Sequence, residues 1–277
     1  MHKGDGGSFD TNWRKTEEAN YSHFTRGPVK NQIQLAFRNH WEVACTMISK
    51  PINELKVLEI GCGRGSLSAY FADVGADCHL LDISPKAIEL AKKSFASLNL
   101  SGNFYVADCE KLPFLDETFD FVFSIGLLEH FEDITLVLAE KNRVLKNDGL
   151  MFNYIVPKLP NNVQVEYEWF NDILRTYAPV NSASEKVDVF RSDLLSDRYV
   201  PVLAKLGMKE IFSSGIYPLP MISNSPEFPF TLLNEKAEEI LVKKFEEQLR
   251  TRESISNIHP WLCDETVGQA ILVCAVK

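Results

Sequence analysis

Three glycines at alternate positions, Gly61, Gly63 and Gly65, lie in the sequence VLEIGCGRGS, which covers residues 57–66. Positions without side chains let backbone N–H groups come close to a ligand, and the N-terminus of a following helix attracts a carboxylate or phosphate. Glu59 precedes this loop, and Asp82 follows it at about 20 residues, the distance at which an acid meets ribose hydroxyls in nucleotide-binding folds. These residues predict a site for a small ligand with an anionic end and a sugar.

A second candidate for chemistry is His130, in the sequence SIGLLEHF of residues 124–131. A neutral imidazole near pH 7 can take a proton from a hydroxyl or amine, so His130 is the candidate general base. In the alternative interpretation, His130 hydrogen-bonds the backbone and only shapes its loop.

Alternating strands and helices must position these residues. Short apolar runs predict strands that end near Ile60, Asp82, Asp108, Ile125 and Val156. Helices are expected between them, and Ser84-Pro85 is typical of an N-cap followed by a first helical residue. This alternation predicts an α/β fold with a doubly wound, mostly parallel sheet whose ligand-facing loops share one edge.

The remaining chain predicts additions to this core. Helical spacing of apolar residues extends from Trp13 to Lys50, and further strands are expected at 209–215 and 270–276, which makes seven. We expect an N-terminal helical extension or lid over residues 1–50 and a second unit over 51–277 that carries cap insertions at about 157–198 and 217–265. The second insertion either completes a substrate pocket or forms a subunit interface, as in a homodimer.

The GCGRG spacing, the acid before it and Asp82 together resemble class I S-adenosylmethionine-dependent methyltransferases of the small-molecule type, over residues 52–157. The resemblance implies that S-adenosylmethionine is the cofactor and that a methyl group passes by in-line displacement to the oxygen or nitrogen of a small acceptor. It assigns to the cofactor Glu59, Gly61, Cys62, Gly63, Asp82, Ile83, Asp108, Cys109 and Ser124, and also Tyr21 and Arg26 of the N-terminal segment.

Several of these assignments have a structural alternative. Asp108 either accepts a hydrogen bond from the adenine amine or caps a turn. Tyr21 and Arg26 either meet the methionine carboxylate or fix the N-terminal helix to the core. His23, Trp169, Tyr217 and Trp261 are candidates for contact with the acceptor, although aromatic side chains and His also occur in cores.

No metal is expected. Related methyltransferases bind a divalent ion through a Glu-His pair with another glutamate three residues before it, and here Gly126 occupies that first place. The six cysteines form no CxxC motif, which excludes a zinc site of that type and indicates reduced thiols in a cytoplasmic protein.

The composition limits the partners. A net charge of −9 disfavours nucleic acid, which is bound through basic patches, and no apolar run is long enough to cross a membrane. A small-molecule substrate is therefore expected. Two alternatives stay open: a non-catalytic subunit that binds S-adenosylmethionine, and a nicotinamide-dependent oxidoreductase, which the glycine spacing disfavours.

Overall fold

The computed structural model describes residues 13, 23–158, 190–219, 233–255 and 257–277. Within them, an eight-stranded sheet has the order β3-β2-β1-β4-β5-β8-β6-β7. The strands are β1 (Lys56–Ile60), β2 (Asp77–Asp82), β3 (Asn103–Val106), β4 (Phe119–Ile125), β5 (Leu145–Ile155), β6 (Lys209–Ile216), β7 (Leu262–Cys263) and β8 (Ala270–Val276).

The first five strands are parallel, and β8, β6 and β7 extend the sheet in antiparallel pairing. The α/β class and the doubly wound, mostly parallel sheet are thus confirmed. The strand number of seven was wrong within the described residues, because the two-residue β7 of the second insertion pairs with β6 at Gly215 and Ile216. Such a short pairing has no periodicity that a sequence pattern can reveal.

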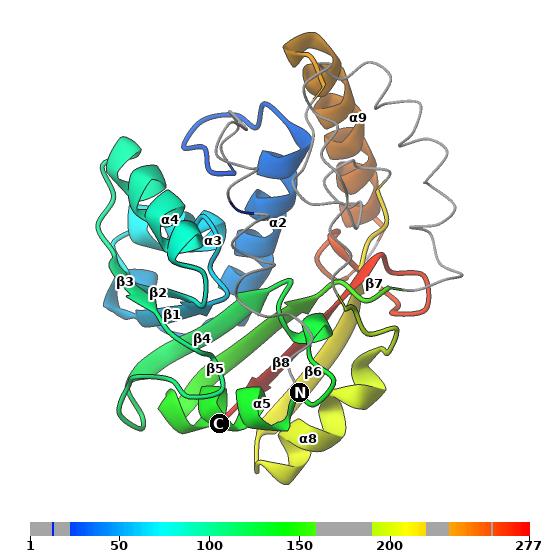
Figure 1. Cartoon of the computed structure of the whole chain (residues 1–277). Helices are drawn as coiled ribbons and strands as arrows, with labels where there is room; N and C mark the ends of the chain where they lie inside the picture. Colours follow the sequence, from blue (N-terminus) through cyan, green and yellow to red (C-terminus); the bar gives the residue numbers. More distant parts are fainter. Residues whose placement is uncertain (1–12, 14–22, 159–189, 220–232, 256) are drawn as a thin grey trace.

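Helices cover both faces of the sheet (Figure 1). On one face lie α2 (Gln32–Met47), α3 (Ser66–Asp73) and α4 (Pro85–Ser97), and on the other lie α5 (Thr135–Val144) and α8 (Val200–Lys205). Two buried apolar clusters fill the spaces between the sheet and these two layers. The sheet is therefore buried on both faces, as continuous apolar strands such as β4 predict.

The N-terminal helix is shorter than predicted. It begins at Gln32, because Asn31 is its N-cap and the Asn31 side chain accepts a hydrogen bond from the backbone N–H of Gln34 at 2.9 Å. Gly27 and Pro28 precede it in irregular backbone. The predicted cap of α4 is confirmed, since the Ser84 hydroxyl accepts from the backbone N–H of Ala87 at 3.1 Å.

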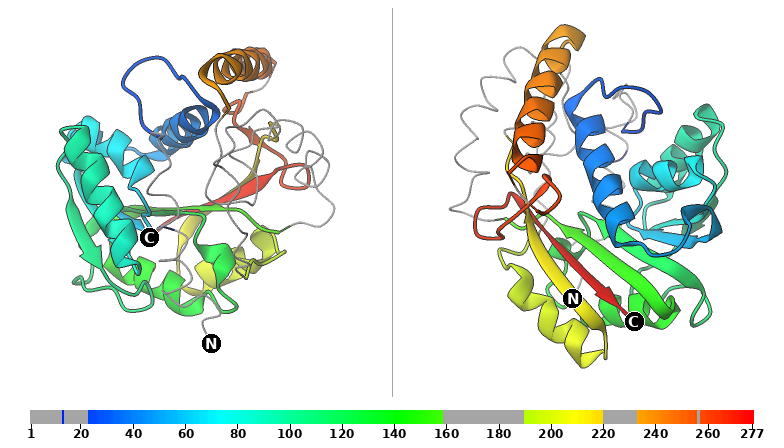
Figure 2. Two further views of the ribbon diagram at one scale, coloured as in Figure 1. Left: turned by 45° about the horizontal axis from the view of Figure 1, so that its top comes forward. Right: turned by 180° about the vertical axis from the view of Figure 1, so that it is seen from behind.

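The second insertion contributes α9 (Glu235–Glu253), which lies beside α2 (Figure 2). The Glu238 carboxylate joins them, since it accepts from the backbone N–H and the side-chain amide of Gln32 at 2.9 and 3.0 Å. Glu238 also accepts from the backbone N–H of Leu233. The described part of this insertion is therefore attached to the N-terminal helix.

The sheet has its topological switch point between β1 and β4, from which the chain proceeds outward on both sides. Ligands of open α/β sheets bind outside the carboxyl ends of the strands at this point. The glycine loop follows β1, and the loop with His130 follows β4 and contains the short 3-10 helix η2 (Leu128–His130). Both candidate groups thus lie at the edge where a ligand is expected.

No helix among the described residues has the length and apolar character that a membrane span requires.

Candidate functional site

The glycine loop is fixed to the end of β2 by its own backbone amides. Cys62 donates to the carbonyl of Leu81 at 3.0 Å, Gly63 donates to Asp82 Oδ2 at 3.0 Å, and Gly65 donates to the carbonyl of Cys62 at 2.7 Å. Gly63 and Gly65 have φ angles of +51° and +70°, which disfavour residues with a Cβ. The loop is therefore held in one shape by contacts within the protein.

Asp82 connects the two halves of the predicted ligand site. Its Oδ1 accepts from the backbone N–H of Ser84 at 2.9 Å, while Oδ2 accepts from Gly63. Burial raises the pKa of Asp82, whereas the backbone hydrogen bonds oppose that change. Each carboxylate oxygen can accept more than one hydrogen bond, so these contacts leave capacity for a ligand hydroxyl.

Glu59 lies beneath the same loop and is 3% exposed. Its Oε2 accepts from the backbone N–H of Ser68 in the first turn of α3 at 3.2 Å. Burial raises the pKa of Glu59 to about 8, although hydrogen bonds from Ser68 lower it, and nearby Asp82 contributes to the rise. Glu59 therefore holds the helix start against β1, and its role toward a cofactor stays a prediction.

Sequence reasoning missed a contact of Trp13 with the loop. A Cβ built on Gly63 would lie 2.4 Å from Cη2 and 2.6 Å from Cζ2 of Trp13, so the indole ring rests directly on the glycine backbone. A larger residue at position 63 would displace the ring. No local pattern announces this contact, because 50 residues separate the two positions.

The described candidates of the N-terminal segment make contacts within the protein, and their roles toward a ligand stay predictions. Arg26 donates through Nε to Asp73 Oδ1 at 2.6 Å and through Nη2 to the carbonyl of Leu98 at 3.0 Å, which ties the segment to α3 and α4. His23 packs edge-on against Phe37, and burial, with Arg64 nearby, lowers its pKa to about 3. Tyr21 lies outside the described residues.

The residues expected near the adenine lie at the carboxyl ends of β2 and β3. Ile83 is 40% exposed although it is apolar and follows the buried Asp82. Cys109 is buried. Asp108 Oδ1 accepts from the backbone N–H of Glu110 at 2.9 Å, which is the turn-capping geometry. An exposed apolar side chain beside a carboxylate suits a purine nucleoside, which presents a flat face and hydroxyls.

The loop after β4 holds His130 in one tautomer. Its Nδ1 lies 2.8 Å from the carbonyl oxygen of Phe190. A carbonyl only accepts, so Nδ1 carries the proton in the neutral ring and Nε2 is the nitrogen that can take another. The hydrogen bond to backbone and the capacity for base chemistry thus occur together, and sequence reasoning had treated them as alternatives.

Ser124 lies in a buried polar network instead of an open site. Lys141 of α5 is fully buried, and its Nζ donates to Ser124 Oγ at 2.8 Å and to Asn153 Oδ1. The Asn153 side-chain amide donates to the carbonyl of Val273 at 3.1 Å, so the network crosses β4, β5 and β8. A lysine in a helix ordinarily faces solvent, and no local pattern distinguishes Lys141 from such a residue.

Lys141 makes stability depend on pH. Burial lowers its pKa to about 7 from the ordinary 10.5. Between these values the unfolded chain binds one proton more than the folded chain, so the free energy of unfolding rises with pH. We expect urea denaturation to show a rise of roughly 1–2 kcal/mol from pH 7 to pH 9 that Lys141→Met abolishes. An equal rise in the variant and in the original protein would show that other groups cause it.

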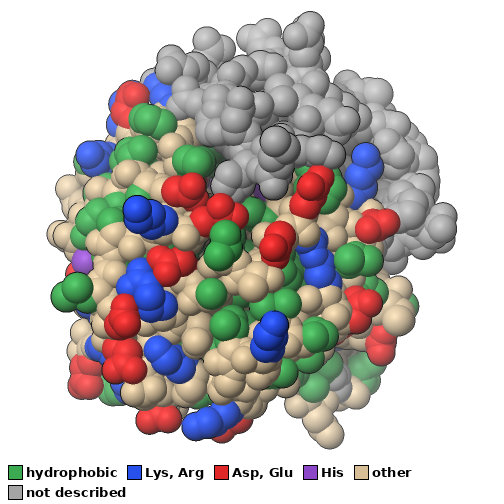
Figure 3. All heavy atoms as spheres, turned by 60° about the horizontal axis from the view of Figure 1, so that its bottom comes forward, with side chains coloured by type: hydrophobic (Ala, Val, Ile, Leu, Met, Phe, Trp, Pro, Cys, Tyr) green, Lys and Arg blue, Asp and Glu red, His purple; other side chains and the backbone are tan. Residues whose placement is uncertain are grey.

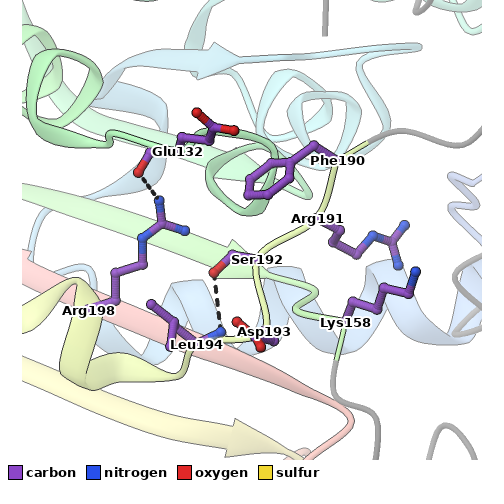
Figure 4. A pocket seen from close by; sticks show the side chains of 8 residues that line it. All are labelled: Glu132, Lys158, Phe190, Arg191, Ser192, Asp193, Leu194 and Arg198. Carbon is purple, nitrogen blue, oxygen red and sulfur yellow. Dashed lines mark hydrogen bonds between the residues drawn. The ribbon is translucent and has the colours of Figure 1, made fainter. Parts of the chain in front are cut away.

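An open pocket of about 530 Å³ adjoins the His130 loop (Figure 4). Basic and acidic side chains and one aromatic ring line it: Lys158, Arg191, Arg198, Glu132, Asp193 and Phe190, with Ser192 and Leu194. Figure 4 shows Lys158 and Arg191 extending side by side, while Arg198 donates to the carbonyl of Glu132 at 2.9 Å on the opposite side. The sequence did not single out these residues, because the pocket combines segments more than 25 residues apart.

The other candidates for acceptor contact lie apart from this pocket or outside the described residues. The Tyr217 ring lies under the Arg252 guanidinium at 3.8 Å, and the Tyr217 N–H donates to the carbonyl of Trp261. Trp261 is fully buried, and its Nε1 donates to His40 Nδ1 at 3.1 Å, so it is a core residue. Trp169 is not among the described residues. The described part of the chain contains no group of three or more His, Cys, Asp or Glu side chains placed to hold a metal.

Known methyltransferases are similar in sequence to this chain. The family described as methyltransferase domain matches residues 58–153. Sterol 4-C-methyltransferase strm-1 of Caenorhabditis elegans is 28% identical over 184 residues, which are 62% of this chain and 52% of that protein. Ubiquinone biosynthesis O-methyltransferase of Pelagibacter ubique is 30% identical over 154 residues, which are 53% of this chain and 64% of that protein. The chain thus spans between half and two thirds of the length of these two curated relatives.

Among solved structures, the [4+2]-cyclase SpnF superposes with a TM-score of 0.58, at 16% identity, over 100% of this chain and 96% of that one. At this identity the likeness establishes the fold alone. It also shows that one fold serves more than one reaction, so function must be argued from the site.

Proposed function

We propose that this chain, whose residues 58–153 match the methyltransferase domain family, is a class I S-adenosylmethionine-dependent methyltransferase that transfers a methyl group to a small-molecule acceptor. One observation carries the proposal: the hydrogen bond from Gly63 to Asp82 joins the loop that would hold the amino-acid end of the cofactor to the carboxylate that would hold its ribose. The curated relatives named above act on small molecules according to their names, which supports this acceptor class.

The residues at the edge of the sheet fit the cofactor. Asp82 has acceptor capacity for ribose hydroxyls, and the exposed Ile83 side chain offers an apolar surface to a purine. Glu59, buried under the loop, carries a carboxyl group that could accept a hydrogen bond from the cofactor's ammonium group. When bound, the cofactor supplies a methyl group activated by a positive sulfur.

The acceptor side would be provided by the loop after β4 and the pocket beside it. His130 Nε2 would take the proton of a hydroxyl or amine as that group attacks, since Nδ1 is engaged with Phe190. The pocket offers charges of both signs and the Phe190 ring, which suits a small molecule with polar and apolar parts. Methyl transfer needs little beyond correct placement in a dry site, so this pocket would contribute by orientation.

Asp82 provides a test of the cofactor site. Asp82→Ala should weaken binding of S-adenosylmethionine by about 1–3 kcal/mol, because a ribose hydroxyl pair loses its acceptor and the glycine loop loses an anchor. Isothermal titration calorimetry measures this change. The matched control is Asp120→Ala, which removes a similarly buried carboxylate. Asp120 lies at the amino end of β4, away from the carboxyl ends of the strands, and pairs there with Lys50 and Lys146. An unchanged dissociation constant for Asp82→Ala would refute the role of this residue.

The acceptor can be identified directly. We would incubate the protein with a metabolite extract and S-adenosylmethionine labelled in its methyl group, and search for labelled products by mass spectrometry. A labelled small molecule would name the acceptor and its methylated atom. Tight cofactor binding with no labelled product from any candidate would instead favour a non-catalytic S-adenosylmethionine-binding subunit, and binding of NAD would favour an oxidoreductase.

The surface agrees with a small-molecule substrate. Basic and acidic side chains are interspersed on the face shown in Figure 3, where no extended basic surface is present among the coloured residues. Such a face gives little attraction to a polyanion. That the protein binds no nucleic acid, acts in the cytoplasm and forms a homodimer stays a prediction, as does the division at residue 50 with cap insertions.

A further inference from the structure

The carboxylate of Glu129 is buried beside the candidate base. Glu129 is 1% exposed and precedes His130 in η2. Among the described residues, none makes a hydrogen bond to its Oε2. Buried carboxylate oxygens are ordinarily satisfied, and an unsatisfied one costs free energy, so such an atom calls for a reason.

The two side chains are arranged for an electrostatic interaction. Glu129 Oε1 lies 4.0 Å from His130 Nε2, which is the nitrogen that carries no proton in the neutral ring. This separation exceeds a hydrogen bond, so the neutral ring gains little from the carboxylate. Once Nε2 is protonated, however, two opposite charges lie 4.0 Å apart in a partly buried place, where their attraction is stronger than in water.

Backbone contacts hold this pair in position. The Glu129 carbonyl accepts from the N–H of Ser192 at 2.7 Å, and the Ser192 carbonyl accepts from the N–H of Lys158 at 2.8 Å. Phe190 meanwhile holds His130 through Nδ1. The segment 190–192 therefore fixes both members of the pair, and neither needs to be ordered during a reaction.

Other polar groups face Glu129 from three directions. They are Arg191 of the same segment, Tyr154 of β5 and Tyr199 before α8. Burial raises the pKa of Glu129, while His130 and Arg191 oppose the rise. Arg191 is the fixed cation here, and the two tyrosine hydroxyls stay neutral because burial, together with Glu129, raises the pKa of each.

We propose that Glu129 is a positioning residue that acts through His130 by stabilising the imidazolium formed when Nε2 accepts the acceptor's proton. The proposal rests on the proposed function. In the balanced step, the acceptor's O–H or N–H bond breaks and its proton goes to Nε2. The freed electron pair bonds to the methyl carbon, whose bond to sulfur breaks with its electron pair on the sulfur.

The test is titration of His130 by NMR in the full chain with isotopically labelled histidine. Glu129→Gln keeps the shape and removes the charge, so the pKa of His130 should fall by about one unit. Glu129→Asp keeps the charge at a greater distance and should give a smaller fall. The control is Glu132→Gln, an exposed acid two residues after His130, which should leave the pKa of His130 within about 0.2 units because solvent screens its charge.

An equal pKa of His130 in the original protein and in Glu129→Gln would overturn the proposal. If that variant does not fold, an equal pKa in Glu129→Asp would overturn it in the same way. Calorimetry with S-adenosylmethionine on the same samples separates the two levels of inference. Absence of S-adenosylmethionine binding by the original protein would refute the proposed function. Normal binding, together with a His130 titration that Glu129→Gln leaves unchanged, would refute the role of Glu129 alone.

Discussion

His130→Ala is expected to lower the turnover number about 100-fold or more while changing the dissociation constant of S-adenosylmethionine less than about twofold. A positioned general base typically contributes this much or more to a rate. Nε2 is the proton-accepting atom, because the Phe190 carbonyl holds the proton on Nδ1. The carbonyl contact also holds the ring in the loop after β4. Removing the ring should therefore affect the attack on the methyl group more than cofactor binding.

Single-turnover kinetics with labelled cofactor and the acceptor found by mass spectrometry measure this effect. His259→Ala is the matched control, since the His259 side chain has a similar exposure, 16% against 14% for His130, and lies in the second insertion. Equal turnover of His130→Ala and the original protein would leave only positioning as the source of catalysis. A large loss of cofactor affinity in His130→Ala would indicate that the substitution acts by disturbing the loop after β4 and not by removing a base.

Gly65→Ala is expected to lower the free energy of unfolding by roughly 2–4 kcal/mol, from two separate causes. Gly65 has a φ of +70°, which costs about 1 kcal/mol for a residue with a Cβ. The added Cβ would also lie 2.4 Å from Leu80 Cδ2 and 2.8 Å from Phe95 Cε2. Both side chains are fully buried between β2 and α4, so they cannot move away without further cost, of the order of 1–3 kcal/mol.

Urea denaturation measures this change, and Gly207→Ala isolates the first cause. Gly207 has a φ of +78°, and a Cβ there would have no atom within 4 Å. Its substitution should therefore cost only about 1 kcal/mol. Equal losses in the two variants would show that the packing against Leu80 and Phe95 relaxes freely. We also expect Gly65→Ala to weaken cofactor binding, because Gly65 is the N-cap residue of α3 and closes the loop onto Cys62.

The local elements of the domain could be read from the sequence because their signals are local. Strand β4 was predicted to end near Ile125, as observed, since an apolar run buried on both faces differs plainly from its flanks. The cap at Ser84 was equally clear, because capping depends on a hydroxyl and a proline at adjacent positions. The helical pattern was given from Trp13, whereas α2 begins at Gln32, because Asn31 caps it and irregular backbone precedes it over residues 23–31.

The sequence by itself determined the α/β class, the succession of strands and helices along the chain from β1 to β6, and the shared edge of the sheet for the loops after the parallel strands. These follow from periodicity and from right-handed crossovers. Only the tertiary structure decided what each side chain does there. It placed Trp13 on Gly63, Lys141 under Ser124, and Glu129 4.0 Å from His130. It also paired the Arg26 guanidinium with the Asp73 carboxylate. Whether a polar side chain meets solvent, a ligand or a buried partner depends on segments distant in the chain, and no local pattern records that contact.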